Sequence, residues 1–582
     1  MSRIENLRAL MRAHGWDAVI VSGSDPHCSE YPARRWKQVE WLTGFTGEAG
    51  DVVVTEDHAG LWTDTRYFIQ ATGQLAGTGV VLHKTRVPGQ VLIPEWLRGN
   101  LEKGSTIAVD GLCQNADFIY DLQDDFQIVS VPDMLSAIWQ DRPEIPQTPI
   151  ITVDPGESRE EKISWLQAVL EEKGCDGMFI SALDEIAWML NVRASDIDYN
   201  PFAISWLYIG NDCTKWFVLK DKVEDPDTEK TFRELAAHGV EILPYVEAES
   251  FLREYGGRLA VDSDSINWHL WNTLVCSKVS LRSPIQLRKA VKNPVEIEGM
   301  RKAHLADGIA MEKFLYWLEK SLDAGKMVNE WDAAVKLAQY RSEAEEYTGD
   351  SFETISAYGP GGALPHYITP STDAPIIHQQ GLFLCDSGGQ YTFGTTDITR
   401  TVPLGECTRL EQEDYTLVLK GHIDLASAVF PEGTAGCQID ALAREPLWRS
   451  GRNFGHGTGH GVGWFLGVHE GPHDVRQNFN SQALLPGMIL SDEPGIYREG
   501  QHGVRHENLL LCIELPSTEF GRWRGFETLT LCHFDTSAII KEMLGEEQTA
   551  WLNAYNARVC ETLAPLLPEE VAQWLRKKTE AI

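Results

Sequence analysis

The sequence lacks the features of a disulfide-stabilised or membrane-spanning protein. Its eleven cysteines are an odd number, stand singly and include no CxxC pair, which argues against a disulfide framework and a zinc finger. No stretch approaches the roughly eighteen uninterrupted apolar residues of a transmembrane helix. Residues 1–12 hold Glu5 and three arginines in place of the apolar core of a signal peptide. We therefore expect a cytoplasmic protein with reduced thiols.

Positive charge is also scarce. The 51 Lys and Arg residues face 85 Asp and Glu residues, a formal net charge of -34. Such an excess repels nucleic acid, anionic membranes and polyanionic substrates, so we expect no partner of these kinds. With 582 residues, 43% of them hydrophobic, the chain can form substantial cores in three or four domains.

Five residues in the last third of the chain have the chemistry of metal ligands: Asp386, Asp397, His460, Glu493 and Glu507. Four carboxylates and one imidazole form a hard, anionic set that cannot be buried together unless cations neutralise it. The residue types therefore predict divalent metals, and we interpret the chain as a two-metal hydrolase.

The sequence predicts a pair of strands that carries the two aspartates. Residues 381–386 form an apolar run that ends in Asp386, and residues 395–402 form a β-branched run around Asp397. Gly388-Gly389 would allow the turn between the runs. The pattern thus predicts that the aspartates lie on neighbouring strands.

The two glutamates are also placed by predicted strands. Residues 488–493 form an apolar strand that delivers Glu493 before a Pro-Gly stop. Residues 503–509 are strand-like, and a period of two puts Arg505 and Glu507 on one face. Such an arginine can keep a ligand carboxylate ionised and oriented.

The histidine ligand belongs to a glycine-rich segment, residues 455–463, which is too rich in glycine for a helix and is predicted to be a loop. Other histidines have a simpler interpretation as hydrogen-bonded core residues. We assign that role to His378, His422 and His502. The period of two points His506 away from the cluster, where we expect a hydrogen-bonded histidine in the opposite layer.

Four strings join these residues into a longer pattern: DSGGQYTFGTTDITRT from Asp386, HGTGHGVGWFLGVHEGP from His456, SDEPGIY from Ser491 and GVRHENL from Gly503. The pattern resembles the metallopeptidases of the pita-bread fold. Within them it is similar to the aminopeptidase P family, the Xaa-Pro aminopeptidases, in their three-domain form. The resemblance extends over nearly the whole chain through four further strings: SEYPARRWKQVEWLTGFTGEAG, LWTDTRYF, LDEIAWMLNVR and NPVEIEGMRKAH.

The resemblance implies a ligand assignment. Asp397 and Glu507 would bridge two metals, His460 and Glu493 would complete one of them, and Asp386 would bind the other. The metals would be two Mn²⁺ ions, with Co²⁺ or Zn²⁺ as substitutes. A hydroxide held between them would attack the scissile carbonyl of a peptide with proline in second place.

The resemblance also implies roles for residues beside the metals. His366 and His469 would bind substrate and carry protons, His456 would line the proline pocket, and Tyr497 would contact substrate. Glu493, as well as binding metal, would pass a proton to the leaving nitrogen. Arg505 would join His366, His469 and Glu493 in the catalytic group.

The expected fold is α/β (α+β): two related creatinase-N-like α/β domains, residues 1–150 and 151–288, precede a pita-bread catalytic domain with a C-terminal extension, residues 289–582. Proline-bearing linkers support the division, at residues 141–149 and 281–284. A short repeat also supports it, because residues 15–22 parallel residues 174–181. Helical periodicity in residues 549–582 predicts a dimerisation or docking element. The resemblance implies a homodimer.

Three other functions compete with this interpretation. A prolidase would use the same metal cluster on Xaa-Pro dipeptides. A pita-bread domain can also be a non-catalytic binding platform, as in a histone chaperone, but such proteins lose metal ligands. A metal-free hydrolase of the creatinase type would leave four carboxylates without neutralising cations, which is electrostatically unfavourable.

Overall fold

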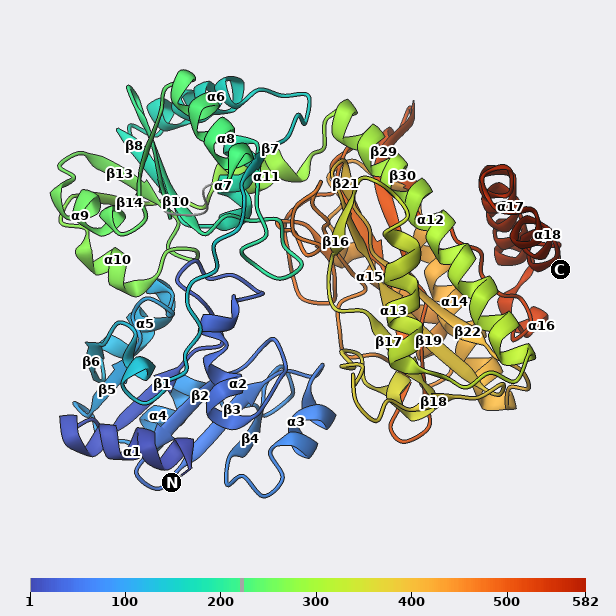
Figure 1. The fold of residues 1–582 in the computed structure, drawn as a ribbon, viewed down its shortest axis with the longest axis horizontal. Helices are drawn as coiled ribbons and strands as arrows, with labels where there is room; N and C mark the ends of the chain where they lie inside the picture. Colours follow the sequence, from blue (N-terminus) through green and yellow to red (C-terminus); the bar gives the residue numbers. More distant parts are fainter. Residues whose placement is uncertain (1, 220–224) are drawn as a thin grey trace. The chain divides into compact units, whose positions relative to one another are not determined.

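A computed structural model describes residues 2–219 and 225–582. The chain forms two compact units, residues 1–285 and 286–582, and Figure 1 shows the elements of each. None of the described helices has the length and apolar character needed to cross a membrane. All eleven cysteines are free thiols.

The first unit contains two six-stranded sheets with the same topology. The first sheet has the order β4 (Val81–Lys84), β3 (Ala59–Thr63), β2 (Asp51–Thr55), β1 (Ala18–Val21), β5 (Thr106–Val109) and β6 (Gln127–Ser130). The second has the order β12 (Val240–Pro244), β11 (Thr214–Val218), β10 (Ser205–Gly210), β8 (Gly177–Ile180), β13 (Arg258–Val261) and β14 (Ser277–Ser280). Each central strand, β1 or β8, is antiparallel to one neighbour and parallel to the other. The predicted internal repeat is therefore confirmed as two α/β domains of one design.

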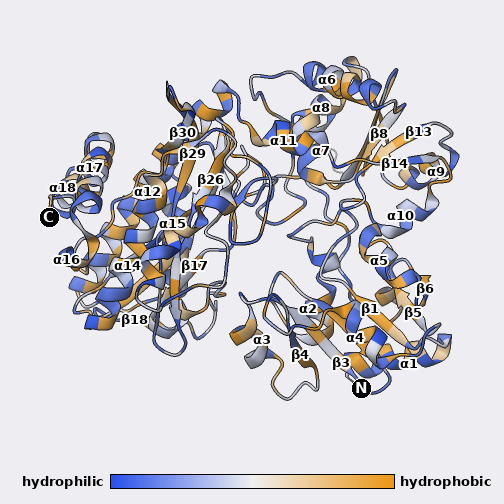
Figure 2. Cartoon of the chain, turned by 180° about the vertical axis from the view of Figure 1, so that it is seen from behind, coloured by the Kyte–Doolittle hydropathy of each residue, from blue (hydrophilic) through white to orange (hydrophobic). Residues whose placement is uncertain are grey.

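Helices flank both sheets. Those of the first domain are α1 (Arg3–His14), α2 (Gln38–Thr43), α3 (Phe68–Gln74), α4 (Ile93–Asn100) and α5 (Ala116–Gln123). Those of the second are α6 (Arg159–Glu172), α7 (Leu183–Leu190), α8 (Pro226–Ala237), α9 (Glu247–Glu254) and α10 (Trp268–Thr273). The central strands β1 and β8 are buried along their whole length, and apolar residues are concentrated there (Figure 2).

The repeat is visible at matching turns. Gly15 and Gly174 follow α1 and α6 with φ of 70° and 64°, a left-handed conformation that glycine adopts at little cost and that ends a helix. The two domains also join symmetrically, because Ala116 N donates to Ile266 O at 3.2 Å and Trp268 N donates to Gln114 O at 2.7 Å.

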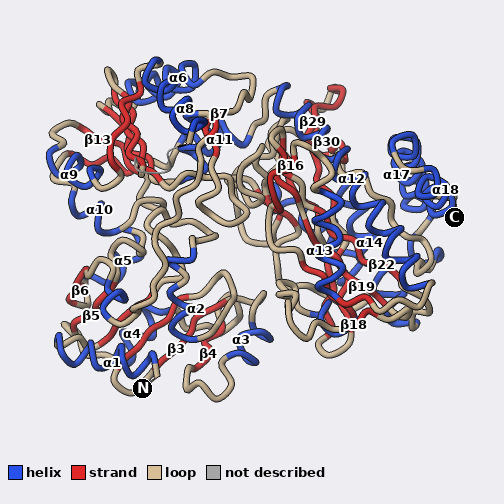
Figure 3. Tube along the Cα trace, in the orientation of Figure 1, coloured by secondary structure: helices blue, strands red, loops and turns tan. Residues whose placement is uncertain are grey.

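The second unit places helices over curved antiparallel strands. Its helices include α12 (Pro294–Asp323), α13 (Glu330–Arg341), α14 (Arg409–Ala426) and α15 (Gly436–Trp448). One sheet has the order β17 (Ile355–Tyr358), β19 (Leu382–Ser387) and β22 (Ile398–Pro403). The other has the order β23 (Phe430–Pro431), β30 (Gly521–Thr528), β29 (Asn508–Thr518) and β26 (Ile489–Asp492). Figure 3 shows α12, α13 and α14 alongside these strands, and α12 contacts α13, which in turn covers β17.

Short ladders complete the second unit. They join β16 (Tyr347–Asp350), β20 (Gly389–Tyr391) and β21 (Gly394–Thr395), then β24 (Gly459–His460) with β25 (Asp474–Val475), and β27 (Gly495–Arg498) with β28 (His502–Arg505). The start of α12 matches its sequence signal, because Asn293 Oδ1 accepts from Val295 N and Glu296 N ahead of a proline at the first turn.

The C-terminal segment docks on its own unit. Helices α16 (Lys541–Leu544), α17 (Glu546–Leu563) and α18 (Glu569–Lys578) follow the last strand. Leu552, Val559 and Leu563 of α17 are buried in the core that includes α12. The docking alternative is thus what the structure shows, while the role in a dimer and the domain boundaries at 150/151 and 288/289 stay predictions.

Candidate metal centre

Asp386 lies on one strand and Asp397 lies just before the neighbouring antiparallel strand, close to the sequence prediction. Asp386 is on β19 and pairs with Thr399 of β22, and Asp397 directly precedes β22. The predicted turn at Gly388-Gly389 is wrong, because the chain continues through β20 and turns between Tyr391 and Gly394. Glycine is needed at 388 for another reason: a Cβ there would lie 2.1 Å from Thr396 O.

Glu493 and His460 are joined by the end of β26. Glu493 follows this strand, and its N–H donates to Thr458 O at 2.8 Å. Ser491 Oγ accepts from His460 N at 2.9 Å and lies 3.2 Å from Glu493 Oε1. A Cβ on Gly459 would lie 1.9 Å from Ser491 O. The glycine-rich segment therefore reaches the strand because it lacks side chains at the contact, and β24 holds His460 there.

The predicted ligands converge. Donor atoms of Asp397, His460 and Glu507 all lie within 4.8 Å of one another. His460 Nε2 is 3.5 Å from Asp397 Oδ2 and 3.5 Å from Glu493 Oε1. Asp386 Oδ1 is buried without a hydrogen-bond partner in the part of the chain that the structure describes. A buried carboxylate oxygen with no donor is costly unless a cation binds it, so the site fits divalent ions.

Electrostatics support the same conclusion. Burial raises the pKa of Asp386, and the neighbouring Asp397 raises it further. Burial and the surrounding carboxylates also raise the pKa of Glu493 to about 7 and hold that of Glu507 well above its usual range. Divalent ions would offset the cost of burial and the repulsion between the carboxylates, and would keep all the carboxylates ionised.

The tautomer of His460 suits a metal ligand. Its Nδ1 lies 3.0 Å from Gly461 O, a carbonyl that can only accept, so Nδ1 carries the proton. The lone pair then belongs to Nε2, the atom that faces Asp397 and Glu493. This is the usual arrangement for a histidine that binds metal through one nitrogen and is oriented through the other.

Arg505 connects three parts of the site. Its Nη2 donates to Asp386 Oδ2 at 2.5 Å, its Nη1 to Tyr497 Oη at 2.7 Å and its Nε to Thr399 Oγ1 at 3.2 Å. Thr399 Oγ1 in turn donates to Glu507 Oε2 at 2.8 Å. Arg505 and Glu507 therefore meet on one side of the chain, as predicted, although the strand is interrupted between β28 and β29.

His456 and His469 lie beside this cluster, and His366 lies near His456. His456 Nδ1 donates to Gly457 O at 2.7 Å, and its Nε2 is 2.8 Å from Tyr497 Oη. Burial, aided by Arg505, holds the pKa of His456 well below its usual range, so the ring is neutral. The ring of His469 stands edge-on to His460 with centroids 4.3 Å apart. His366 is half-buried and close enough for its charge to lower the pKa of His456.

Sequence reasoning missed the residues that hold the histidine loop. Thr458 Oγ1 donates to Asp440 Oδ1 at 2.6 Å, and Arg444 Nε donates to Asp440 Oδ2 at 2.7 Å. Arg444 Nη2 also donates to His456 O at 2.7 Å. The spacing of Asp440 and Arg444 on one helix could have suggested their ion pair, but no local signal pairs them with Thr458.

Arg400 supports the site from behind and was also missed. Its side chain is fully buried, and its Nη1 donates to Thr399 O at 3.0 Å and to Glu507 O at 2.6 Å. The guanidinium therefore joins β22 to the backbone of Glu507, a predicted ligand.

The remaining histidines give mixed outcomes. The hydrogen-bonded core role is confirmed for His422, whose Nδ1 lies 3.0 Å from Asp492 O, and for His502, whose Nε2 lies 2.9 Å from Asp414 Oδ2. It is wrong for His378, which is exposed.

His506 is buried away from the cluster, as predicted, with its ring edge-on to Tyr415 and Phe534. The expected hydrogen bond is wrong, because neither ring nitrogen has a partner among the described residues. Burial lowers the pKa of His506 well below its usual range, which fits a neutral ring in an aromatic layer.

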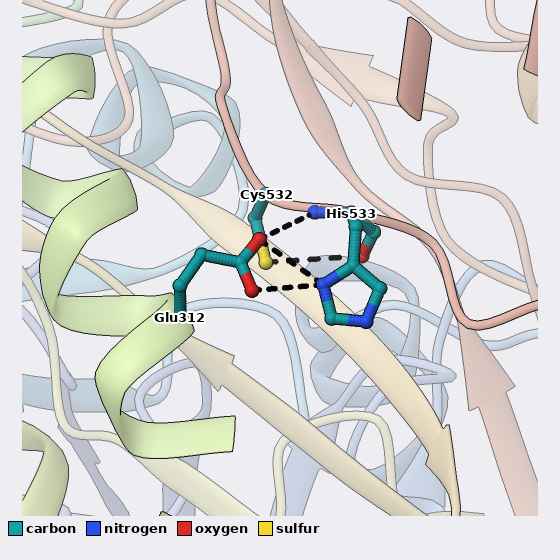
Figure 4. Close-up of side chains that lie close together, drawn as sticks. All are labelled: Glu312, Cys532 and His533. Carbon is teal, nitrogen blue, oxygen red and sulfur yellow. Dashed lines mark hydrogen bonds and ion pairs between the residues drawn. The ribbon is translucent and has the colours of Figure 1, made fainter. Parts of the chain in front are cut away.

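A second group of donor residues, Glu312, Cys532 and His533, does not have the character of a metal site (Figure 4). Both carboxylate oxygens of Glu312 are already hydrogen-bonded to His533, at 2.9 Å to its backbone N and 2.8 Å to Nδ1. Burial raises the pKa of the Cys532 thiol well above its usual range, so it stays protonated. We assign this group a structural role.

Family comparisons cover nearly the whole chain. A model described as metallopeptidase family M24 matches residues 298–514, and one for the C-terminal region of these peptidases matches residues 522–582. Two models of the creatinase/prolidase N-terminal domain match residues 3–142 and 141–296.

Individual relatives match over their full length. The chain is 37% identical to a probable Xaa-Pro aminopeptidase P of Tuber melanosporum, covering 100% of this chain and 99% of that one. It is 35% identical to aminopeptidase P1 of Arabidopsis thaliana, with the same coverage. Among solved structures, it is similar to an X-prolyl aminopeptidase from Caenorhabditis elegans, described as a cytosolic enzyme with a di-nuclear active site. The TM-score is 0.95 at 34% identity, covering 100% and 99% of the two chains.

Proposed function

The chain belongs to the Xaa-Pro aminopeptidase P family of M24 metallopeptidases, and we propose that it releases the amino-terminal residue from peptides whose second residue is proline. It is a metal-dependent aminopeptidase with two creatinase-type domains ahead of its catalytic unit. The observation that carries the proposal is the convergence of Asp397, His460 and Glu507, with Glu493 3.5 Å from the imidazole.

We assign five residues to a pair of divalent ions. Asp397 and Glu507 would bridge them, His460 and Glu493 would complete one, and Asp386 would bind the other. When bound, the ions supply an activated water and polarise the scissile carbonyl. The set is dominated by carboxylates, which favours Mn²⁺ over metals that prefer thiolates, with Co²⁺ or Zn²⁺ as substitutes.

Side chains around the metal site would position the substrate and move protons. Glu493, 3.5 Å from the His460 imidazole, would take a proton from the attacking water and return it to the proline nitrogen. His366 and His469 would donate hydrogen bonds to the substrate carbonyl. Neutral His456 would line the proline pocket together with Tyr497.

Arg505 has a supporting role in this scheme. Its charge-assisted hydrogen bond to Asp386 opposes the rise in the pKa of that carboxyl that burial causes, and it also donates to the hydroxyl of Tyr497. A tertiary Xaa-Pro amide has no N–H, so peptidases that use that donor are poorly suited to it. A rigid pocket around the proline ring is the alternative that this chain can offer.

Prolidase activity is the alternative with the same chemistry. The Xaa-Pro dipeptidase of Bacillus anthracis shares the fold, but it covers only 64% of this chain, with a TM-score of 0.52. The C. elegans enzyme covers all of it. Full-length similarity therefore favours the aminopeptidase. A non-catalytic platform is disfavoured because all five ligand residues are present.

The deciding experiment offers three peptides, Xaa-Pro-Yaa, Xaa-Pro and Xaa-Ala-Yaa, to manganese-loaded and chelator-treated protein, and identifies the products by mass spectrometry. We expect release of the first residue from Xaa-Pro-Yaa alone, and only with metal. Cleavage of Xaa-Pro alone would show a prolidase, and no cleavage would point to a binding role.

We also propose a cytosolic location and a homodimer. The cytosolic description of the C. elegans enzyme and the free cysteines support the first. The homodimer rests on the resemblance alone, and light scattering of the purified protein at several concentrations tests it.

A further inference from the structure

A buried group of three charged side chains lies beside the candidate metal centre. Glu470 Oε2 is 2.7 Å from Lys289 Nζ, and Glu470 Oε1 is 2.8 Å from Lys292 Nζ. Each of the three side chains is only 1% exposed. Removing three charges from water is costly, so this triad is a poor choice for stability alone.

The two lysines belong to the segment that leads into the second unit. Lys289 lies near the end of α11 (Pro284–Ala290), and Lys292 lies between α11 and α12. The backbone of this segment is also fixed, since Lys292 N donates to Gly487 O at 2.9 Å. A Cβ on Gly487 would lie 2.9 Å from Lys292 O, so the approach of the two segments depends on glycine.

The backbone of Glu470 holds the acceptor that orients a predicted metal ligand. Glu470 N donates to Gly461 O at 2.8 Å, and the same carbonyl accepts from His460 Nδ1 at 3.0 Å. The preceding residue, His469, has its ring 4.3 Å from the ring of His460. A displacement of residue 470 would therefore move both histidines.

The glycine-rich loop is shaped to fit Glu470. A Cβ on Gly461 would lie 2.0 Å from Glu470 O, and one on Gly463 would lie 2.8 Å from Glu470 Oε2. These two glycines thus leave room for the backbone and the carboxylate of one residue. The contacts join the loop, Glu470 and the lysines into a single packed unit.

We propose that the Lys289–Glu470–Lys292 triad is a positioning device for the metal centre. It fixes Glu470, and through Gly461 O it fixes the tautomer and orientation of His460 and the place of His469. The segment that follows the N-terminal domains is thereby part of the support of the active site. The inference rests on the proposed function for the roles of the two histidines, and none of the three triad residues is itself catalytic.

Lys289→Met and Lys292→Met test the proposal in the full-length protein. Each variant nearly keeps the length of the side chain and leaves Glu470 paired with one lysine, so we expect the fold to be retained. Glu470→Gln would instead leave both lysines buried without their carboxylate, so it is not used. Loss of a residue that orients a metal ligand typically weakens metal binding about 10- to 100-fold. We expect a loss of that size in Mn²⁺ affinity, measured by electron paramagnetic resonance without peptide. We also expect an altered visible spectrum of the Co²⁺-loaded protein, and kcat on Xaa-Pro-Yaa should fall more than KM changes.

The matched control is Lys162→Met. Lys162 is as buried, at 1% exposure, but belongs to the first unit, where it donates to Trp188 O and Asn191 Oδ1. It should lower the melting temperature without changing Mn²⁺ affinity or the Co²⁺ spectrum. If the triad variants behave like this control, the triad is only structural and the proposal is overturned. Because metal binding is read without peptide, a wild-type protein inactive on Xaa-Pro-Yaa would refute the proposed function and still leave this test decisive.

Discussion

Thr399 Oγ1 donates a 2.8 Å hydrogen bond to Glu507 Oε2. The same hydroxyl accepts from Arg505 Nε at 3.2 Å, so its proton is directed to the glutamate. Thr399 also pairs with Asp386 across β19 and β22. A single hydroxyl on β22 thus orients the Glu507 carboxylate and contacts Arg505, which donates to Asp386.

Thr399→Val should therefore weaken the metal site without leaving a cavity in the core. Valine has nearly the same shape but removes the hydrogen bonds of Thr399 Oγ1 to Glu507 Oε2 and Arg505 Nε. We expect metal affinity and kcat/KM to fall about 10- to 100-fold, measured by metal titration and by peptide kinetics.

Thr399→Ser is the matched control, because it keeps the hydroxyl and removes only a methyl group. It should retain most of the metal affinity. Equal losses in the two variants would show that packing of the methyl group, and not the hydrogen bond to Glu507, is what the site requires.

Short-range patterns of apolar and polar residues predicted most of the architecture. Apolar runs placed Asp386 and Glu493 at the ends of predicted strands, and alternation placed Glu507 on the same face as Arg505, because strand periodicity is local. The repeat at Gly15 and Gly174 predicted two related domains, since the same helix end and strand start recur at both places.

Contacts between distant segments could not be predicted. The pairing of Thr458 with Asp440 and of Glu470 with Lys292 depends on how loops fold back, and no residue spacing encodes it. Gly388 was expected to make a turn, whereas it is needed for the close approach of Thr396 O. A sequence identifies a glycine without showing which of these two uses applies.

Glu493→Ala and His460→Ala should abolish turnover while the protein stays folded. Each removes a predicted ligand, and in the proposed mechanism Glu493 would also carry the proton, a role typically worth about 10²- to 10⁴-fold in rate. Peptide kinetics and circular dichroism of the same samples are the measurements. Glu499→Ala, at an exposed neighbour, is the control and should be active. Wild-type turnover in either ligand variant with metal bound would refute the site assignment.

Removing metal should destabilise the second unit alone. Ions that bind only the folded state add about 2.7 kcal/mol when present at 100 times their dissociation constant. Chelator should lower the melting transition that contains residues 286–582, and added Mn²⁺ should restore it. The transition of residues 1–285 is the internal control. If chelator shifts neither transition, the cluster does not bind metal in the folded protein.

The hairpin that carries Tyr497 and Arg505 is fastened to α14 by one carboxylate. Asp414 accepts from Arg498 Nε at 2.5 Å, from Arg452 Nε at 2.7 Å and from His502 Nε2 at 2.9 Å. Burial alone would raise the pKa of Asp414, but these hydrogen bonds outweigh it and hold the pKa well below its usual value.

Asp414→Asn should therefore lower stability at neutral pH, and the difference should shrink in acid. A carboxyl whose pKa is depressed by folding stabilises the protein above its unfolded pKa of about 4, and this contribution is lost as the pH falls through the folded pKa. Urea midpoints of metal-free wild type and variant between pH 7 and 3 measure it, because metal release then plays no part. The difference between the two midpoints should begin to shrink below about pH 4, where Asp414 of the unfolded wild-type chain takes up a proton that the folded protein binds only at lower pH. A difference that stays constant with pH would mean that Asp414 acts through its shape and not its charge. In that case the hairpin would be held by packing, and kcat of the metal-loaded variant should match wild type.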